Sequence, residues 1–160
     1  MGPMVKLLAT ALNEAFNEAS WHGTNLKGSL RGVGIEEAAW RPTSGRHNIW
    51  EIAVHTSYWK YAVWRRLTGE KRGSFAIKGS DWFPRPEKTT IQAWRADKAL
   101  LDEEHRKLRD AVTSLTDADL RCRAGRGQMT IEKLVRGLAA HDLYHAGQIQ
   151  LLKRMFRQLR

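Results

Sequence analysis

The chain has 160 residues, 42% hydrophobic and 28% charged, which is typical of one globular domain over residues 1–160. It has no run of about 20 apolar residues and no apolar leader, so we expect neither a membrane span nor a signal peptide. The single cysteine, Cys122, excludes an internal disulfide and favours a reducing cytoplasm. Its neighbours Arg121 and Arg123 leave a reactive thiol open beside the favoured interpretation of an incidental loop cysteine.

The formal net charge of +10 raises nucleic acid as a partner. The basic residues are spread along the chain, however, without a helix-turn-helix signature, zinc-finger spacing or arginine-rich arm. Nucleic acid is therefore the least favoured partner. A basic surface that attracts a small, anionic substrate explains the charge as well.

Apolar residues at three- and four-residue steps predict an amphipathic helix over residues 4–20. A second apolar set predicts that helix resumes over residues 26–33. Residues 35–40 are expected to form a further short turn of helix, which Pro42 stops. The first quarter of the chain is thus predicted as one long helix followed by shorter helical pieces.

Asn48, with Glu51 three residues later, predicts a capping box and a helix that ends near Gly69. Residues 69–88 follow without clear periodicity, and a connection of this length is often a functional loop or a crossover. Fully extended, it exceeds the length of the helix before it, at about 3.3 Å per residue. The next helix is therefore free to run parallel to that one.

A third long helix is predicted from Thr90 to Leu115, with apolar residues recurring every seven positions. After a polar loop over residues 116–128, Thr130 is expected to cap the last helix. Four long helices without a strand pattern predict an all-α protein, a four-helix bundle with sites built between facing helices.

The last helix carries two histidines where core residues are expected. His141 and His145 are four residues apart, so they project from one face about one turn apart and can converge on a divalent metal. This spacing alone arises often by chance. His55 adds a third imidazole on the apolar stripe of another helix. A metal site between helices is therefore favoured over three polar core residues or a site for adventitious metal.

Three separated segments resemble the DinB/YfiT-like superfamily: residues 40–42 (WRP), 48–55 (NIWEIAVH) and 141–149 (HDLYHAGQI). The resemblance runs through nearly the whole chain. It implies a four-helix bundle in up-down-down-up order with a long crossover between helices 2 and 3. That topology agrees with the long connection over residues 69–88.

The resemblance also implies a divalent metal held by three histidines, which match His55, His141 and His145. It implies a homodimer and, from some members, a transferase or isomerase that uses a low-molecular-weight thiol such as bacillithiol or mycothiol. Zinc suits three imidazoles, and nickel, iron or manganese stay open because imidazole is not selective among them.

Four further residues near the expected ligands receive predictions. Gln148 is a candidate to hydrogen-bond a water on the metal or to make an interhelical contact. Glu51, one turn before His55, is a candidate base, although a helix cap is favoured. Asp142 points about 100° away from its neighbouring ligand, so we expect a salt bridge or hydrogen bond at the rim. Gly147 is expected to permit close helix approach.

Trp82, in the long connection, is the tryptophan expected to contact a ligand. His22 and His47 are weaker candidates for the cavity mouth, and His105 is expected to be structural. The aromatic residues expected in core or dimer packing are Trp50, Trp59, Trp94 and Tyr144.

Three neutral imidazoles with open positions describe a catalytic rather than a closed structural metal site. The favoured function is a metal-dependent thiol S-transferase that acts on a small electrophilic substrate. A metal-assisted hydrolase is the second hypothesis. A non-enzymatic, stress-related metal- or ligand-binding module is the third.

Overall fold

The computed structural model describes residues 1–125 and 127–159, which form helices and loops with one isolated bridge between Arg123 and Thr130. The all-helical prediction is confirmed for these residues. No helix among them has both the length and the apolarity needed to cross a bilayer. The long helices are α1 (Pro3–Phe16), α4 (Ile49–Thr68), α5 (Ile91–Thr113) and α6 (Ile131–Arg157). The connections contain α2 (Leu26–Ser29), α3 (Ile35–Ala39) and the 3-10 turn η1 (Asp119–Arg121).

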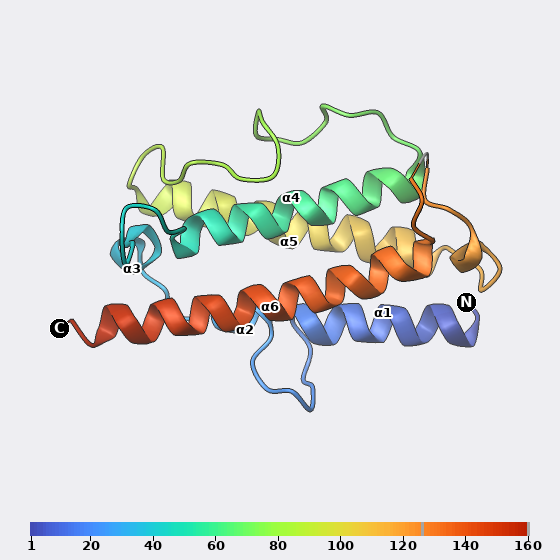
Figure 1. Cartoon of the computed structure of the whole chain (residues 1–160), viewed down its shortest axis with the longest axis horizontal. Coiled ribbons are helices and arrows are strands. Elements are labelled where there is room, and N and C mark those ends of the chain that lie inside the picture. Colours follow the sequence, from blue (N-terminus) through green and yellow to red (C-terminus); the bar gives the residue numbers. More distant parts are fainter. Residues whose placement is uncertain (126, 160) are drawn as a thin grey trace.

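The long helices lie side by side along the molecule (Figure 1). Figure 1 shows α4 and α5 running in one direction, and α1 and α6 running in the opposite direction. Residues 69–90 leave the end of α4 and return along it to the start of α5. The length of this crossover follows from the parallel course of α4 and α5, because the chain must travel back along a whole helix.

The predicted helix starts and stops are set by capping groups. The Asn48 side chain accepts a hydrogen bond from the Glu51 N–H at 2.7 Å, and the Glu51 carboxylate accepts one from the Asn48 N–H at 3.4 Å. This capping box starts α4, and Gly69, with φ of 75°, ends it. The hydroxyls of Thr90 and Thr130 cap α5 and α6. These predicted boundaries are confirmed.

The first helix is shorter than its periodicity predicts. It ends at Phe16, and Asn17 leaves the helical conformation with φ of −147° and ψ of −10°. Ala19, whose spacing suggested that the helix continues, is exposed. Helix beyond Phe16 would bury no further apolar side chain, so packing gives it no support.

The core consists of two apolar clusters with a layer of polar side chains between them. One cluster includes Trp50, Trp94 and Leu101, and the other includes Leu108 and Leu138. The buried polar side chains at the intermediate level include Lys60, His105 and Asp142. His105 stacks on Phe16, with ring centroids 3.8 Å apart, as expected of a structural histidine. Burial, together with the Lys60 charge, lowers the pKa of His105 to about 2.

Asp142 lies in this polar layer, and its predicted place at the rim is wrong. Asp142 and Lys60 both have fully buried side chains and form an ion pair between α6 and α4. Burial lowers the pKa of Lys60 and raises that of Asp142, and the attraction between the two charges opposes both shifts. The rim prediction failed because α6 packs against both α1 and α4, so more than one face of it is buried.

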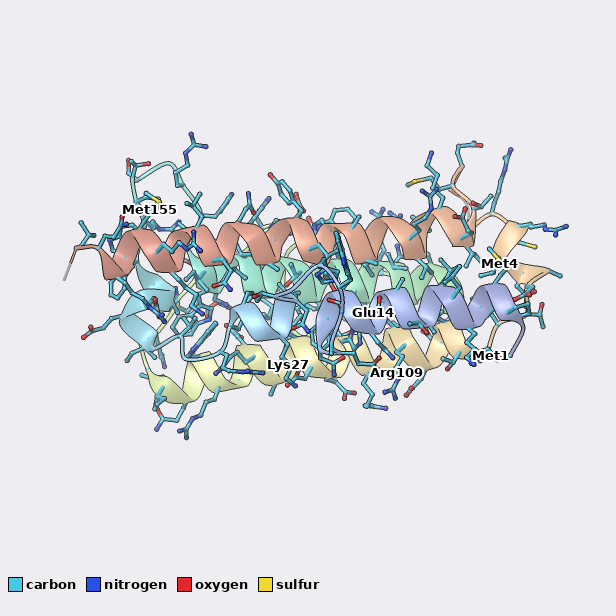
Figure 2. The ribbon with its side chains drawn as sticks, turned by 90° about the horizontal axis from the view of Figure 1, so that it is seen from below. Met1, Met4, Glu14, Lys27, Arg109 and Met155 are labelled. Atoms are coloured by element: carbon cyan, nitrogen blue, oxygen red, sulfur yellow. The ribbon has the colours of Figure 1, made fainter. Side chains whose placement is uncertain are left out.

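The outer face of α6 carries an apolar stripe that is exposed among the residues the structure describes. Tyr144, Leu151 and Met155 are 64%, 59% and 37% exposed. Met155 lies at the opposite end of the molecule from Met4 (Figure 2). Gly147, between Tyr144 and Leu151 on α6, is also exposed. A Cβ built on it has no atom within 4 Å among the described residues. Its predicted role in close helix approach is therefore wrong within the single chain.

Replacing Lys60 by methionine leaves the Asp142 carboxylate buried without its partner. We expect Lys60→Met to lower the free energy of unfolding by about 3–5 kcal/mol in urea denaturation. The double variant Lys60→Met/Asp142→Leu removes both charges and should recover most of that loss. Arg136→Met, which breaks the exposed pair with Glu132, is the control and should cost at most about 1 kcal/mol. A Lys60→Met protein as stable as the wild type would contradict this account.

Candidate metal centre

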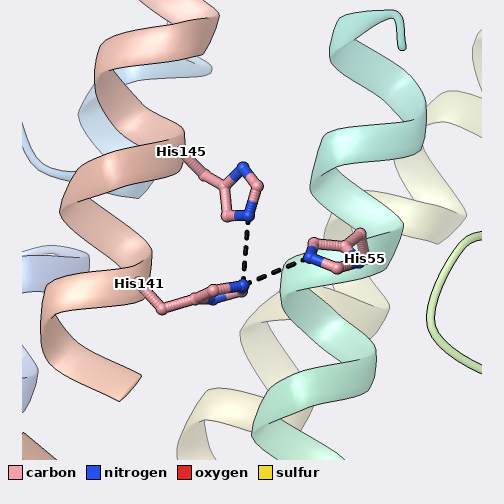
Figure 3. Close-up of side chains that lie close together, drawn as sticks. All are labelled: His55, His141 and His145. Atoms are coloured by element: carbon pink, nitrogen blue, oxygen red, sulfur yellow. Dashed lines mark hydrogen bonds between the residues drawn. The ribbon is translucent and has the colours of Figure 1, made fainter. Parts of the chain in front are cut away.

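Three histidines from two helices converge on one point (Figure 3). His55 comes from α4, and His141 and His145 come from α6. The Nε2 atom of His141 lies 3.2 Å from Nε2 of His55 and 3.1 Å from Nε2 of His145. The structure thus brings together the three residues that the sequence predicted as one group, in an arrangement that could hold a metal ion.

The packing of α4 on α6 sets this convergence. His141 and His145 stand one turn apart on the same face of α6, as their spacing predicts. The buried ion pair joins the same two helices close by, because Asp142 follows His141 directly and Lys60 lies five residues after His55. The ion pair therefore fixes the register of the two helices at the level of the histidines.

The outer ring nitrogens of two histidines have oxygen partners. Nδ1 of His55 lies 2.9 Å from the carbonyl oxygen of Asp81, and Nδ1 of His145 lies 2.7 Å from Oε1 of Gln148. A carbonyl oxygen only accepts, so each Nδ1 must carry the proton and each Nε2 a lone pair. Support of this kind orients metal-binding histidines in proteins. Nε2 of His141 can donate to only one of the two neighbouring nitrogens.

The electrostatic environment keeps all three rings neutral. Burial lowers the pKa of His141 to about 3 and that of His145 to about 4, and the neighbouring imidazoles contribute to both shifts. Burial also lowers the pKa of His55, although Asp81 opposes that shift. Near neutral pH the cluster therefore presents neutral nitrogen donors, which is the form that binds metals.

The distances between the nitrogens fit a divalent metal. Metal–nitrogen bonds of about 2.0–2.1 Å place neighbouring ligand nitrogens about 3.3 Å apart in a tetrahedral site and about 3.0 Å apart in an octahedral one. The observed separations of 3.1 and 3.2 Å lie between these values. Donor type and these two separations agree with a metal site, and a single hydrogen bond from His141 would leave one of the two neighbouring lone pairs without a partner.

All three histidines line a cavity of about 520 Å³, named here the metal cavity. Most of its wall is apolar and includes Trp59, Val63 and Leu138. Arg66 and Lys133 also line it and supply positive charge. The cavity can therefore accept a ligand with an apolar body and an anionic group that faces Arg66 and Lys133.

A neighbouring cavity of about 570 Å³, the flanking cavity, contains His145 but neither of the other two histidines. Trp82 and Tyr144 line both cavities. Trp82 stacks between His55 and His47, with ring centroids 3.8 and 3.5 Å apart. The crossover thereby places an aromatic side chain directly over the candidate centre, in the position expected for contact with a ligand.

Trp59 and Tyr144 both line the metal cavity, which the sequence did not predict. Trp59 also packs against the apolar cluster that contains Leu108 and Leu138, as expected, and donates from Nε1 to Oδ1 of Asp81 at 2.9 Å. Tyr144 is exposed at the boundary of the two cavities, and its hydroxyl accepts a hydrogen bond from Gln148 at 3.1 Å. Trp50 and Trp94 lie in the core as predicted.

Neither predicted catalytic candidate has a free functional group. Gln148 uses its amide oxygen to hold His145 in place. Glu51 is buried, and its carboxylate accepts hydrogen bonds from Arg41, His47 and two backbone N–H groups. Burial acts to raise the pKa of Glu51, but the bonds from Arg41 and His47 outweigh it and hold that pKa below its usual value. The carboxylate of Glu51 is therefore structural.

The remaining candidates divide by position. His47 lines the flanking cavity, whereas His22 and Cys122 are exposed and line none of the cavities described here. Sequence reasoning missed Asp81, whose carbonyl and carboxylate both face His55. Asp81 has a φ of 64°, a conformation that aspartate tolerates better than most residues. The crossover has no sequence periodicity that would have indicated Asp81 as a partner of His55.

Fold and site together define an all-helical protein with a three-histidine group that could hold a metal. A family model of the DinB superfamily matches residues 18–149. The chain belongs to the DinB superfamily. Comparison with curated proteins and with solved structures gave no match.

The hydrogen bonds predict the tautomers of two rings. In metal-free protein near neutral pH, ¹⁵N NMR should show His55 and His145 protonated at Nδ1, because oxygen acceptors face those atoms. Gln148→Leu should release His145 from this tautomer and leave His55 unchanged. Exposed His22, which lies outside the cluster, is the internal reference. A dominant Nε2-protonated form of His55 or His145 in the wild type would contradict the geometry.

Proposed function

We propose that the chain is a divalent-metal-dependent thiol S-transferase that acts on a small electrophilic substrate. The observation that carries the proposal is the convergence of three histidine Nε2 atoms on the wall of a largely apolar cavity, two of them held proton-free by the partners of their Nδ1 atoms. Membership of the DinB superfamily supports it, since some members carry out thiol-dependent chemistry. We further propose zinc as the metal, with nickel, iron or manganese suited to the same three imidazoles.

His55, His141 and His145 would hold the metal, which leaves its remaining positions facing the metal cavity. A divalent metal bound there supplies Lewis acidity, which favours the deprotonated form of a thiol near neutral pH. Asp81 and Gln148 fix the orientation of the rings through their Nδ1 atoms.

The other walls of the metal cavity would receive the two reactants. Trp59 and Leu138 exclude water and contact the apolar body of the electrophile, while Arg66 and Lys133 attract an anionic group. In the transfer, the sulfur of a low-molecular-weight thiol forms a bond to an electrophilic carbon of the substrate. The bond from that carbon to its leaving group breaks, and the proton of the thiol passes to solvent.

We also propose the assembly in which the site works. The long helices form one domain, a four-helix bundle in up-down-down-up order, and two copies form a homodimer. The uncovered apolar stripe of Tyr144, Leu151 and Met155 on α6 supports a partner surface. The single cysteine is consistent with the reducing cytoplasm as the location.

Removing one ligand tests the proposal. We expect His145→Ala to lose bound metal, measured by elemental analysis, and to lose thiol transfer by a factor of more than about 100. The assay combines several low-molecular-weight thiols with a chromogenic aryl electrophile. His22→Ala changes an exposed histidine and should keep both properties.

Three outcomes would contradict the thiol transferase. Turnover that survives in His145→Ala or in chelator-treated protein would remove the metal from the reaction. Hydrolysis of ester or amide substrates without thiol transfer would favour a metal-assisted hydrolase. Strong thermal stabilisation by metal with no turnover of either kind would indicate a non-enzymatic binding module.

A further inference from the structure

A third cavity lies between the C-terminal half of α4 and the crossover. This crossover cavity has a volume of about 550 Å³ and contains none of the three histidines. Trp59 and Arg66 line both it and the metal cavity, so the two are neighbours. Its other walls come from residues 58–65 of α4 and residues 72–80 of the crossover.

Positive charge is concentrated in the crossover cavity. Arg65, Arg66, Arg72 and Lys78 line it, and no carboxylate of the described residues does. Among the described residues, none of these four cations belongs to an ion pair. Only a long hydrogen bond of 3.3 Å from Arg65 to a backbone carbonyl engages any of their charged groups. Four uncompensated cations around one cavity repel one another, and an anion bound among them relieves that repulsion.

Aromatic rings form the inner wall of this cavity. Tyr58, Trp59 and Phe75 are half-buried, and the rings of Tyr58 and Phe75 pack edge to face with centroids 5.4 Å apart. The Tyr61 hydroxyl accepts a hydrogen bond from the Ser74 N–H at 3.2 Å, which ties the crossover to α4. Flat apolar surface beside arginines suits a planar ring that carries negative charges.

We propose that the crossover cavity binds a small organic polyanion, a planar ring bearing two or more negative charges as phosphate or carboxylate groups. The arginines and Lys78 receive the charges, and the aromatic wall receives the ring. This site goes beyond the proposed transferase and does not depend on a metal, because no histidine of the cluster lines it. Its position beyond Trp59 places the bound anion next to the metal cavity.

The test is calorimetric titration of the full chain with ADP, pyrophosphate and adenosine. It is performed on chelator-treated wild type and repeated on His145→Ala, so that binding at the histidines cannot contribute. We expect saturable binding of ADP, weaker binding of pyrophosphate and none of adenosine, with the same affinities in both proteins. Retained binding in His145→Ala keeps this result separate from the fate of the transferase proposal.

Arg72→Ala/Lys78→Ala removes two exposed cations from the crossover and should weaken ADP binding about tenfold or more. Lys6→Ala/Arg154→Ala removes two exposed cations elsewhere and should leave it unchanged. Phe75→Ala should weaken ADP but not pyrophosphate. Absence of saturable binding would overturn the proposal. An equal loss of ADP binding in the Lys6→Ala/Arg154→Ala control would also overturn it, because the basic surface as a whole would then explain the binding.

Discussion

The ion pair between Lys60 and Asp142 is the interaction on which the geometry of the site depends. The three histidines come from two helices, and a metal tolerates little error in the relative position of its ligands. A shift of α4 along α6 would move His55 away from His141, and the same shift would leave two buried charges unpaired. The cost of separating such charges makes one register much more favourable than its neighbours.

The crossover is the second determinant of the site, since it adds groups that the helices lack. The Asp81 carbonyl accepts a hydrogen bond from Nδ1 of His55, and Trp82 stacks on the His55 ring. On its outer side the same segment provides Arg72 and Lys78 to another cavity. One long loop, needed because α4 and α5 run parallel, thus lines both the largely apolar metal cavity and the cationic crossover cavity.

The capped helix ends and the common face of His141 and His145 were predictable because both follow from local rules, whereas His55 was joined to them through its apolar stripe and the family resemblance. Capping residues mark helix ends, and the four-residue spacing of His141 and His145 fixes their common face. Asp142 was misplaced because apolar periodicity indicates a single buried face, whereas α6 is buried on more than one. The positions of Trp59 and Asp81 at the metal cavity could not be predicted from the sequence. The crossover has no periodicity, so its sequence does not indicate which helix face it covers.

X-ray absorption spectroscopy of the zinc-loaded protein is the most direct test of whether His55, His141 and His145 together hold a metal. We expect three imidazole nitrogens at about 2.0–2.1 Å from the zinc and at least one further oxygen ligand, without sulfur. That spectrum would agree with an open site built by His55, His141 and His145. Fewer than three imidazoles, or a sulfur ligand at about 2.3 Å from Cys122, would contradict it.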